Sequence, residues 1–382
     1  MIDKSNRLLS VKEYYFSRKL REVSRLIKSG RPIINMGIGS PDIKPHESVI
    51  NALKESLTFE KAHMYQSYQG ISELRNAMSD FYRNKYNVKL DPSKEILPLI
   101  GSKEGIMHIS LAFLNKGDKV LIPNPGYPTY SSVTKLLEAT PVYYNLCLRN
   151  NWQPDIKELN SINLEGVKIM WLNYPHMPTG VQINSKILIN LINWARKNKI
   201  LLVNDNPYSF ILNDNPNSIM SFSNSMDVVI ELNSLSKSHN LSGWRIGMVV
   251  GNSENINAVL KIKSNIDSGM FYGIQKGAIK ALKLPNKWFD DINEIYFKRR
   301  QLVFELCKLL NLSFDSKSVG MFVWAKLSGK LIKAEEYIDE LLDKFDIFIA
   351  PGTIFGSQGE GYVRFSLCVK EEEIRIAINR LK

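Results

Sequence analysis

The chain has 382 residues, more than one hydrophobic core usually fills, so two domains are expected. Hydrophobic residues make up 44% and charged residues 23% of it, which is typical of a globular protein and excludes the disordered and fibrous classes. The formal net charge is +12, but the lysines are scattered and no basic segment is laced with aromatic residues. The composition therefore predicts no nucleic-acid partner and no membrane surface.

Three cysteines, Cys147, Cys307 and Cys368, show neither a pairing pattern nor the spacing of a zinc site. They predict a reducing compartment, a cytoplasmic location and no metal ion. The stretch 1–15 lacks the apolar core of a signal peptide, and no stretch approaches the roughly 18 apolar residues that cross a membrane.

The first predicted element is a helix at 12–30. Its apolar residues, from Phe16 to Ile27, recur at the spacing of one helix face, and Gly30 is a typical helix stop. The following stretch, 34–42, is too rich in Gly and Pro for a regular element, so we expect a loop.

Between residues 50 and 280, short apolar runs alternate with longer helix-like stretches such as 103–116 and 184–198. Unbroken apolar strands that alternate with helices are typical of a mostly parallel sheet covered on both faces. The predicted strands lie at 96–100, 119–123, 167–172, 199–204, 227–232 and 246–251.

Distinctive polar residues directly follow five of these six runs. Because ligands bind at the carboxyl ends of the strands in such sheets, the five clusters predict a single site at one sheet edge. They lie at 101–103, 124–127, Asn173, Asp205 and 234–237.

The pattern changes after residue 283, where a long amphipathic stretch at 287–310 leads into shorter elements. We expect a smaller α+β domain there, with the N-terminal segment packed against it. The predicted domains are thus 45–282, the large one, and 1–44 with 283–382, the small one.

The segment 234–247, SLSKSHNLSGWRIG, carries the most specific pattern. Lys237 lies just beyond a buried strand, in a sheltered position where an amine loses its proton near neutral pH and can form a Schiff base. Ser234, Ser236 and Arg245 bring hydroxyls and a planar guanidinium, the groups that a phosphate needs.

A second anion site is predicted where a strand meets a helix, at Gly101, Ser102 and Lys103. The N–H groups at the start of a helix have no partner within the helix and favour an anion. This turn therefore suits a phosphate cradle.

The lysine segment resembles that of pyridoxal-phosphate (PLP) aminotransferases of fold-type I, class I/II, and the resemblance covers almost the whole chain. It implies an α/β fold with a large, mostly parallel sheet covered by helices and a smaller α+β domain. It implies PLP as cofactor, joined to Lys237 by a Schiff base, with its phosphate at Ser234, Ser236, Arg245 and the turn 101–103.

Two further motifs carry the resemblance around the cofactor ring. In 123–130, PNPGYPTY, Tyr127 corresponds to the residue that stacks on the ring. In 203–208, VNDNPY, Asp205 corresponds to the aspartate paired with the pyridine nitrogen, and Tyr208 to the tyrosine that donates to the phenolic oxygen.

The segment 171–180, WLNYPHMPTG, departs from the family pattern at one position. Met177 stands where the family has an asparagine that bonds the phenolic oxygen, and a thioether is only a weak acceptor. Asn173, four residues earlier, is carried over as a cofactor contact. Either another donor, such as His176 or Asn173, replaces the missing bond, or the phenolic oxygen has one partner fewer.

The resemblance also assigns residues to the substrate and to a second subunit. Ile38 and Gly39 would pass their backbone close to the substrate, and Arg364 would bind the α-carboxylate through a bidentate fork. Tyr65 corresponds to a tyrosine that reaches the phosphate of the neighbouring subunit, which implies a homodimer.

The expected activity is transamination between an amino acid and a 2-oxo acid, with an aromatic or broad amino donor and 2-oxoglutarate as acceptor. The stretch 14–42 resembles bacterial aminotransferases of aromatic amino-acid synthesis, and 270–272 holds Met-Phe-Tyr instead of a second arginine for a distal carboxylate. An aspartate or LL-diaminopimelate aminotransferase, or a carbon–sulfur β-lyase of the same fold, stays open as an alternative.

Overall fold

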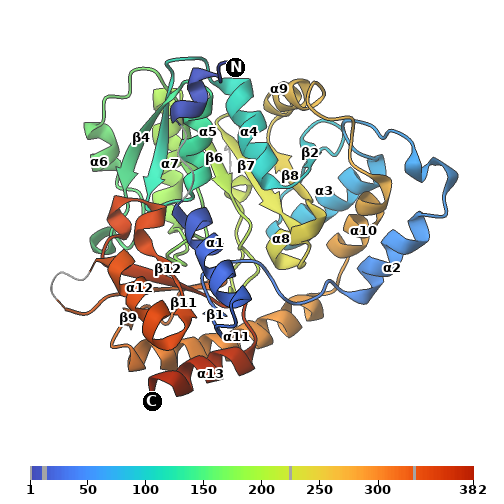
Figure 1. The fold of residues 1–382 in the computed structure, drawn as a ribbon. Coiled ribbons are helices and arrows are strands. Elements are labelled where there is room, and N and C mark those ends of the chain that lie inside the picture. Colours follow the sequence, from blue (N-terminus) through green and yellow to red (C-terminus); the bar gives the residue numbers. More distant parts are fainter. Residues whose placement is uncertain (1, 11–14, 223–225, 330–332) are drawn as a thin grey trace.

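The structure, a computed structural model, describes residues 2–10, 15–222, 226–329 and 333–382 (Figure 1). Its centre is a seven-stranded sheet with the strand order β2-β8-β7-β6-β5-β3-β4. The strands are β2 (Ile96–Leu99), β3 (Lys119–Asn124), β4 (Thr140–Asn145), β5 (Val167–Leu172), β6 (Leu201–Asp205), β7 (Val229–Ser234) and β8 (Gly247–Val250).

The sheet is mostly parallel, as predicted, with one reversed strand. β3 pairs in parallel with β4 and β5, and β6 pairs in parallel with β5 and β7. β8 runs antiparallel to both β7 and β2, so β2 points the same way as the parallel strands. The apolar runs did not reveal the direction of β8, and β4 was missing from the predicted strands.

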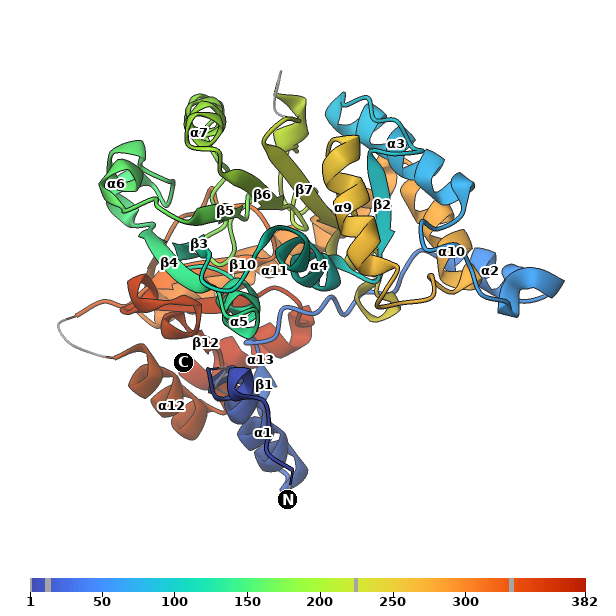
Figure 2. The same cartoon turned by 90° about the horizontal axis from the view of Figure 1, so that it is seen from above.

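Side chains of the central strands alternate between two cores, as the pleat requires. Val120, Ile169 and Val203 belong to one core, which is covered by α4 (Ser102–Phe113), α5 (Pro128–Leu136) and α9 (Ser253–Lys263). The neighbouring residues Leu121 and Met170 belong to the other core, which includes α3 (Ser72–Tyr86) and α7 (Ser185–Asn198). Figure 2 shows α4 and α5 on one side of the strands and α6 (Ile156–Ser161) and α7 on the other.

The C-terminal part forms a second, four-stranded sheet in the order β12-β13-β10-β9. Its long helix α11 (Asn286–Leu309) starts close to the predicted position, and the N-terminal strand β1 (Ile34–Asn35) pairs in parallel with β11 (Ile347–Phe348). The exact domain limits at 45 and 283 stay a prediction. The other strands here are β9 (Ser313–Phe314), β10 (Phe322–Lys326), β12 (Ala350–Pro351) and β13 (Tyr362–Ser366).

Helix α1 (Tyr15–Lys28) packs against the C-terminal part, where Phe16 stacks on Phe348 of β11. The predicted start of this helix at 12 lies outside the described residues. Gly30, with φ of +95°, follows its end. In the part of the chain that is described, no helix is long and apolar enough to cross a membrane. The remaining helices are α2 (Glu47–Ser56), α8 (Leu235–Ser238), α10 (Tyr272–Leu282), α12 (Ala334–Phe345) and α13 (Glu371–Leu381).

Candidate active site

A cavity of about 580 Å³ opens at the carboxyl edge of the large sheet, where all five predicted polar clusters meet. The loops after β2, β3, β5, β6 and β7 each contribute to its wall. Arg245 comes from the loop before β8, and it reaches the same edge because β8 runs in the opposite direction. Twelve predicted residues line the cavity: Gly39, Ser102, Lys103, Tyr127, Asn173, Asp205, Tyr208, Ser234, Ser236, Lys237, Arg245 and Arg364.

Lys237 lies in the one-turn helix α8, directly after β7. The side chain of Ser234 caps this turn by accepting the N–H of Ser236 at 3.2 Å. The amine of Lys237 donates to the carbonyl oxygen of Gly39 at 2.5 Å. Burial lowers the pKa of this amine, and the positive charges of Arg364 and Arg245 lower it further. The amine is therefore more easily deprotonated than a surface lysine, as a nucleophile requires.

The predicted phosphate cradle forms where Gly101 and Arg245 meet. Gly101 has φ of +84° and lies directly before the first residue of α4, Ser102. A Cβ atom at position 101 would collide with the guanidinium of Arg245, so only glycine lets the two lie this close. The guanidinium also donates to the hydroxyl of Ser236 at 3.4 Å. A guanidinium, hydroxyls and a helix start thus converge, as an anion site requires.

Asp205 ends β6 and is only 4% exposed. One carboxylate oxygen accepts the hydroxyl of Tyr130 at 3.0 Å, and the other has no partner. Burial raises the pKa of this carboxyl, the Tyr130 hydrogen bond opposes the rise, and the nearby charge of Glu231 adds to it; together they bring the pKa to about 7. A buried carboxylate with a free oxygen is stabilised by a cationic N–H donor. A protonated pyridine nitrogen in the cavity would be such a donor.

Tyr127 and Tyr208 both line the cavity, where a flat ring could lie beside them. Tyr127 precedes the proline that starts α5, and its ring meets that of Tyr130 edge-on at 5.6 Å. Burial raises the pKa of the Tyr208 hydroxyl, so this group is a proton donor at neutral pH. The ring of Tyr208 packs edge-on against Phe322 at 5.7 Å.

The amide of Asn173 is used by the backbone. Its nitrogen donates to the carbonyl oxygen of Asp205 at 2.6 Å, and its oxygen accepts the N–H of Met177 at 3.0 Å. Asn173 thus ties two loops of the site together. One of its two amide N–H groups and its oxygen are engaged, and the second N–H has no protein partner in the cavity wall.

His176 does not replace the asparagine that the family has at position 177. Its ring is buried and bonds the carbonyl oxygen of Pro125 at 3.1 Å and the hydroxyl of Thr179 at 2.8 Å. Burial lowers its pKa to about 3, so the ring is neutral. Met177 itself contacts Arg364, whose Nη1 lies 3.3 Å from the thioether sulfur. Of the predicted donors to the phenolic oxygen, Tyr208 and the second N–H of Asn173 stay available, and His176 does not.

Arg364 lies on β13 and is 6% exposed. Its guanidinium is held between the rings of Phe322 and Phe355, at 4.0 and 4.7 Å from their centres. Nη2 donates to the carbonyl oxygen of Gly37 at 2.8 Å, and Nε has no partner. Burial lowers its pKa to about 10. This buried cation touches neutral groups, so a carboxylate entering the cavity meets an uncompensated positive charge.

Three predicted residues do not line the cavity. Gly101 lies behind Arg245, while Ile38 is partly exposed next to the lining residue Gly39. Tyr65 is 91% exposed, so it is no core residue of its own subunit. Its predicted role in a neighbouring subunit stays a prediction.

Sequence reasoning missed several lining residues. Tyr130 lies within the motif PNPGYPTY and Phe355 lies nine residues before Arg364, but no role was assigned to either. Phe322, on β10, had no local pattern to mark it. Tyr15 and Phe16 reach the cavity from α1. Phe16 was attributed to a helix face only, and Tyr15 was assigned no role.

These side chains fit PLP: Lys237 for its aldehyde carbon, the turn at 101–103 with Arg245 for its phosphate, and the free oxygen of Asp205 for its ring nitrogen. The fold and the site together define a PLP-dependent enzyme of fold-type I.

The family model "aminotransferase class I and II" matches residues 31–381. An LL-diaminopimelate aminotransferase of Aquifex aeolicus is 36% identical over 384 residues, covering 100% of this chain and 99% of that protein. One of Halothermothrix orenii is 38% identical over 383 residues, covering 100% and 98%. Substrate-bound BacF from Bacillus subtilis superposes with a TM-score of 0.95 at 30% identity, covering 100% and 97%. The chain therefore belongs to the class I and II aminotransferases, a PLP-dependent family of transferases.

Proposed function

We propose that the protein transfers an amino group from LL-diaminopimelate to 2-oxoglutarate. The main support is the full-length similarity to two LL-diaminopimelate aminotransferases, at 36% and 38% identity. This corresponds to the alternative considered from the sequence. The expected aromatic or broad donor has weaker support.

The cavity is compatible with a substrate that is polar at both ends. Arg364 is positioned for one α-carboxylate. LL-diaminopimelate carries a second amino and carboxylate pair, and Tyr15 and Ser17 add two hydroxyls to the cavity wall. We assign the distal pair to these groups.

The residues divide the chemistry among them. PLP, when bound, supplies the electron sink for the pair of electrons released at the substrate α-carbon. Arg364 orients the substrate through its carboxylate, and Asp205 keeps a proton on the pyridine nitrogen by charge pairing. Once the substrate amine has displaced it from the aldehyde carbon of the cofactor, the Nζ of Lys237 would take the proton from the substrate α-carbon as a general base. It would then deliver that proton to the former aldehyde carbon of the cofactor as a general acid.

An aromatic donor is the second candidate, and the apolar part of the wall favours it. The aromatic residues that line the cavity are Tyr15, Phe16, Tyr127, Tyr130, Tyr208, Phe322 and Phe355. Phe322 and Phe355 hold Arg364, and Tyr127 and Tyr208 are assigned to the cofactor. The rings of Tyr15 and Phe16 on α1 therefore remain to contact an aromatic side chain of a substrate.

A donor panel tests the proposal. Purified enzyme with PLP and 2-oxoglutarate is incubated with LL-diaminopimelate, its meso isomer, aspartate, tyrosine or phenylalanine, and glutamate is measured. The highest kcat/KM is expected with LL-diaminopimelate, and Lys237→Ala serves as the inactive control. A higher value with tyrosine or phenylalanine would transfer the assignment to the aromatic candidate. Pyruvate released from cystathionine at a higher rate would indicate the β-lyase instead.

We also propose a homodimer with shared sites. Exposed apolar side chains gather on the segments 57–68 and 264–271, and such a patch is typical of an interface. Tyr65 lies within it. Sedimentation analysis should give a dimer, and a monomer at micromolar concentration would contradict the proposal. The exposed residues are Leu57, Phe59, Met64, Tyr65, Tyr68, Ile266 and Phe271.

The cytoplasmic location likewise stays a proposal. It is supported by the three cysteines, which are free thiols in the structure.

A further inference from the structure

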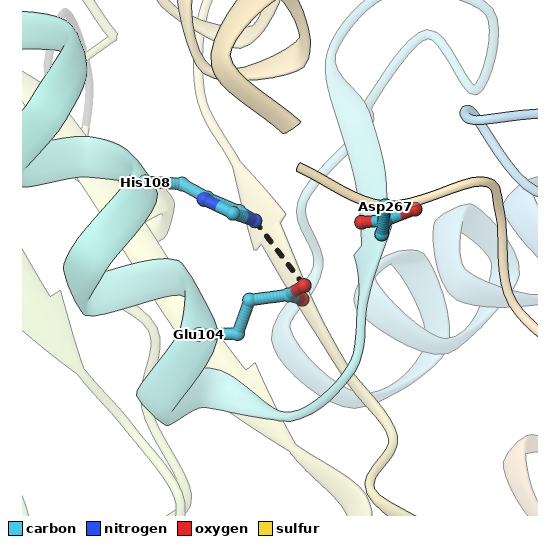
Figure 3. A group of neighbouring side chains, drawn as sticks. All are labelled: Glu104, His108 and Asp267. Carbon is cyan, nitrogen blue, oxygen red and sulfur yellow. Dashed lines mark ion pairs between the residues drawn. The ribbon is translucent and has the colours of Figure 1, made fainter. Parts of the chain in front are cut away.

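Behind the predicted phosphate turn lies a cluster of four ionisable side chains that the chemistry of the cavity does not use. Glu104 and His108 come from α4, Lys263 ends α9, and Asp267 follows in the next loop. Figure 3 shows Glu104 and His108 on one helix face with Asp267 across from them. His108 and Lys263 are each 1% exposed. Because a buried ammonium is costly, Lys263 requires a partner of opposite charge.

The two carboxylates are held by different partners, and the ring nitrogens of His108 have no hydrogen-bond partner among the described residues. Lys263 donates to both oxygens of Asp267 at 2.7 Å. One oxygen of Glu104 lies 3.2 Å from the Nε2 of His108, and the other accepts the backbone N–H of Ile100 at 2.6 Å. Through Glu104 the cluster is therefore bonded to the backbone of Ile100, the residue between β2 and Gly101.

The same side chains are close enough together to suggest a metal site, since the ligand atoms of Glu104, His108 and Asp267 lie within 4.8 Å of one another. The ammonium of Lys263, however, already holds both oxygens of Asp267. A metal ion would have to displace this buried ammonium, at the cost of leaving it unpaired. The resident cation of the cluster is therefore Lys263.

The contact with Ile100 matters because Gly101 is the next residue in the chain. Gly101 has φ of +84°, and its missing side chain makes room for the guanidinium of Arg245. A backbone in this conformation is held by its surroundings, and the carboxylate of Glu104 accepts the last N–H before it. Moving that N–H would displace both the start of α4 and the seat of Arg245.

We propose that Glu104 is a positioning residue for the cofactor phosphate, acting through the backbone of Ile100 and Gly101. The Nε2 of His108 lies 3.2 Å from the other oxygen of the Glu104 carboxylate. The residue touches neither substrate nor cofactor, since Ser102 and Lys103 of the same helix line the cavity and Glu104 does not. Its effect is thus on how tightly PLP is held.

The test compares PLP affinity in matched variants. Glu104→Ala leaves the Ile100 N–H without its acceptor and should weaken PLP binding by about tenfold to a hundredfold. Glu104→Gln keeps an oxygen in place and should recover most of the loss. The dissociation constant is measured by titrating PLP into the apoprotein and following its absorbance, with kcat and the donor KM taken at saturating PLP.

Glu95 provides the control. Its carboxylate accepts the backbone N–H of Asp91 at 2.7 Å, so it makes the same type of bond at the opposite end of β2. Glu95→Ala should lower the unfolding temperature yet leave PLP affinity unchanged. This separates a general loss of stability from a loss at the phosphate turn.

Binding of PLP by Glu104→Ala within twofold of the wild type, or no weaker than by Glu95→Ala, would overturn the proposal. Failure of Glu104→Gln to improve on Glu104→Ala would also overturn it, because the oxygen is the atom invoked. If Glu104→Ala does not fold, Glu104→Asp replaces it, since the shorter side chain withdraws the carboxylate from Ile100 in the same way.

Discussion

Replacing Asp205 with asparagine should stabilise the cofactor-free protein at neutral pH while weakening its function. The carboxyl of Asp205 is 4% exposed, and one of its oxygens has no partner. Burial, helped by the charge of Glu231, raises its pKa from 3.8 to about 7 despite the hydrogen bond from Tyr130. Asparagine keeps the shape and an oxygen for Tyr130 but carries no charge.

The sign and size of the effect come from linkage between folding and protonation. Below pH 3.8 the carboxyl is protonated in both states and costs nothing. As the pH rises to about 7, the unfolded chain has already lost this proton while the folded chain keeps it, so folding stability falls and then levels off. A rise from 3.8 to about 7 corresponds to roughly 4 kcal/mol at 1.36 kcal/mol per unit.

Urea unfolding of the apoprotein, wild type against Asp205→Asn, measures this between pH 4 and pH 8. The variant should be more stable by up to about 4 kcal/mol at pH 8, with the gap closing towards pH 4. His176 and His239, whose pKa values burial lowers to about 3, change stability equally in both proteins and cancel in the difference. A gap that does not change with pH would refute the reasoning.

With PLP bound, Asp205→Asn should lose most of its turnover, because the pyridine nitrogen has no counter-charge. Borohydride reduction of the holoenzyme should attach the cofactor to Lys237, as mapped by mass spectrometry; attachment elsewhere would contradict the site. Arg364→Lys should raise the KM of the 2-oxo acid about tenfold or more with a smaller change in kcat, since lysine lacks the bidentate fork. Met177→Asn should lower the pH midpoint of the cofactor's absorbance change by about one to two units by adding a donor, and an unchanged midpoint would show that another group already serves. Tyr65→Phe should speed PLP loss from the dimer, and an unaltered rate would remove the residue from the neighbouring site.

Local pattern was enough to predict the architecture and much of the candidate site. Buried parallel strands appear as unbroken apolar runs, and the residues that come after them meet because parallel strands end at one edge. Lys237, Asp205 and Arg364 were found from local motifs, and the structure brings all three to one cavity. The family motifs supplied the roles that spacing alone leaves open.

The tertiary structure decided the features that depend on residues distant in sequence. The reversed direction of β8 brings Arg245 to the cavity edge, and an apolar run does not encode strand direction. The aromatic clamp on Arg364 uses Phe322, from another strand, and Glu104 shows its contact with Ile100 only once α4 is folded. The amide of Asn173 lines the cavity and also bonds the backbone of Asp205 and Met177, two partners that its sequence position did not reveal. A sequence shows which groups are present, but their partners are set by packing, because each polar atom bonds whichever group the fold places beside it.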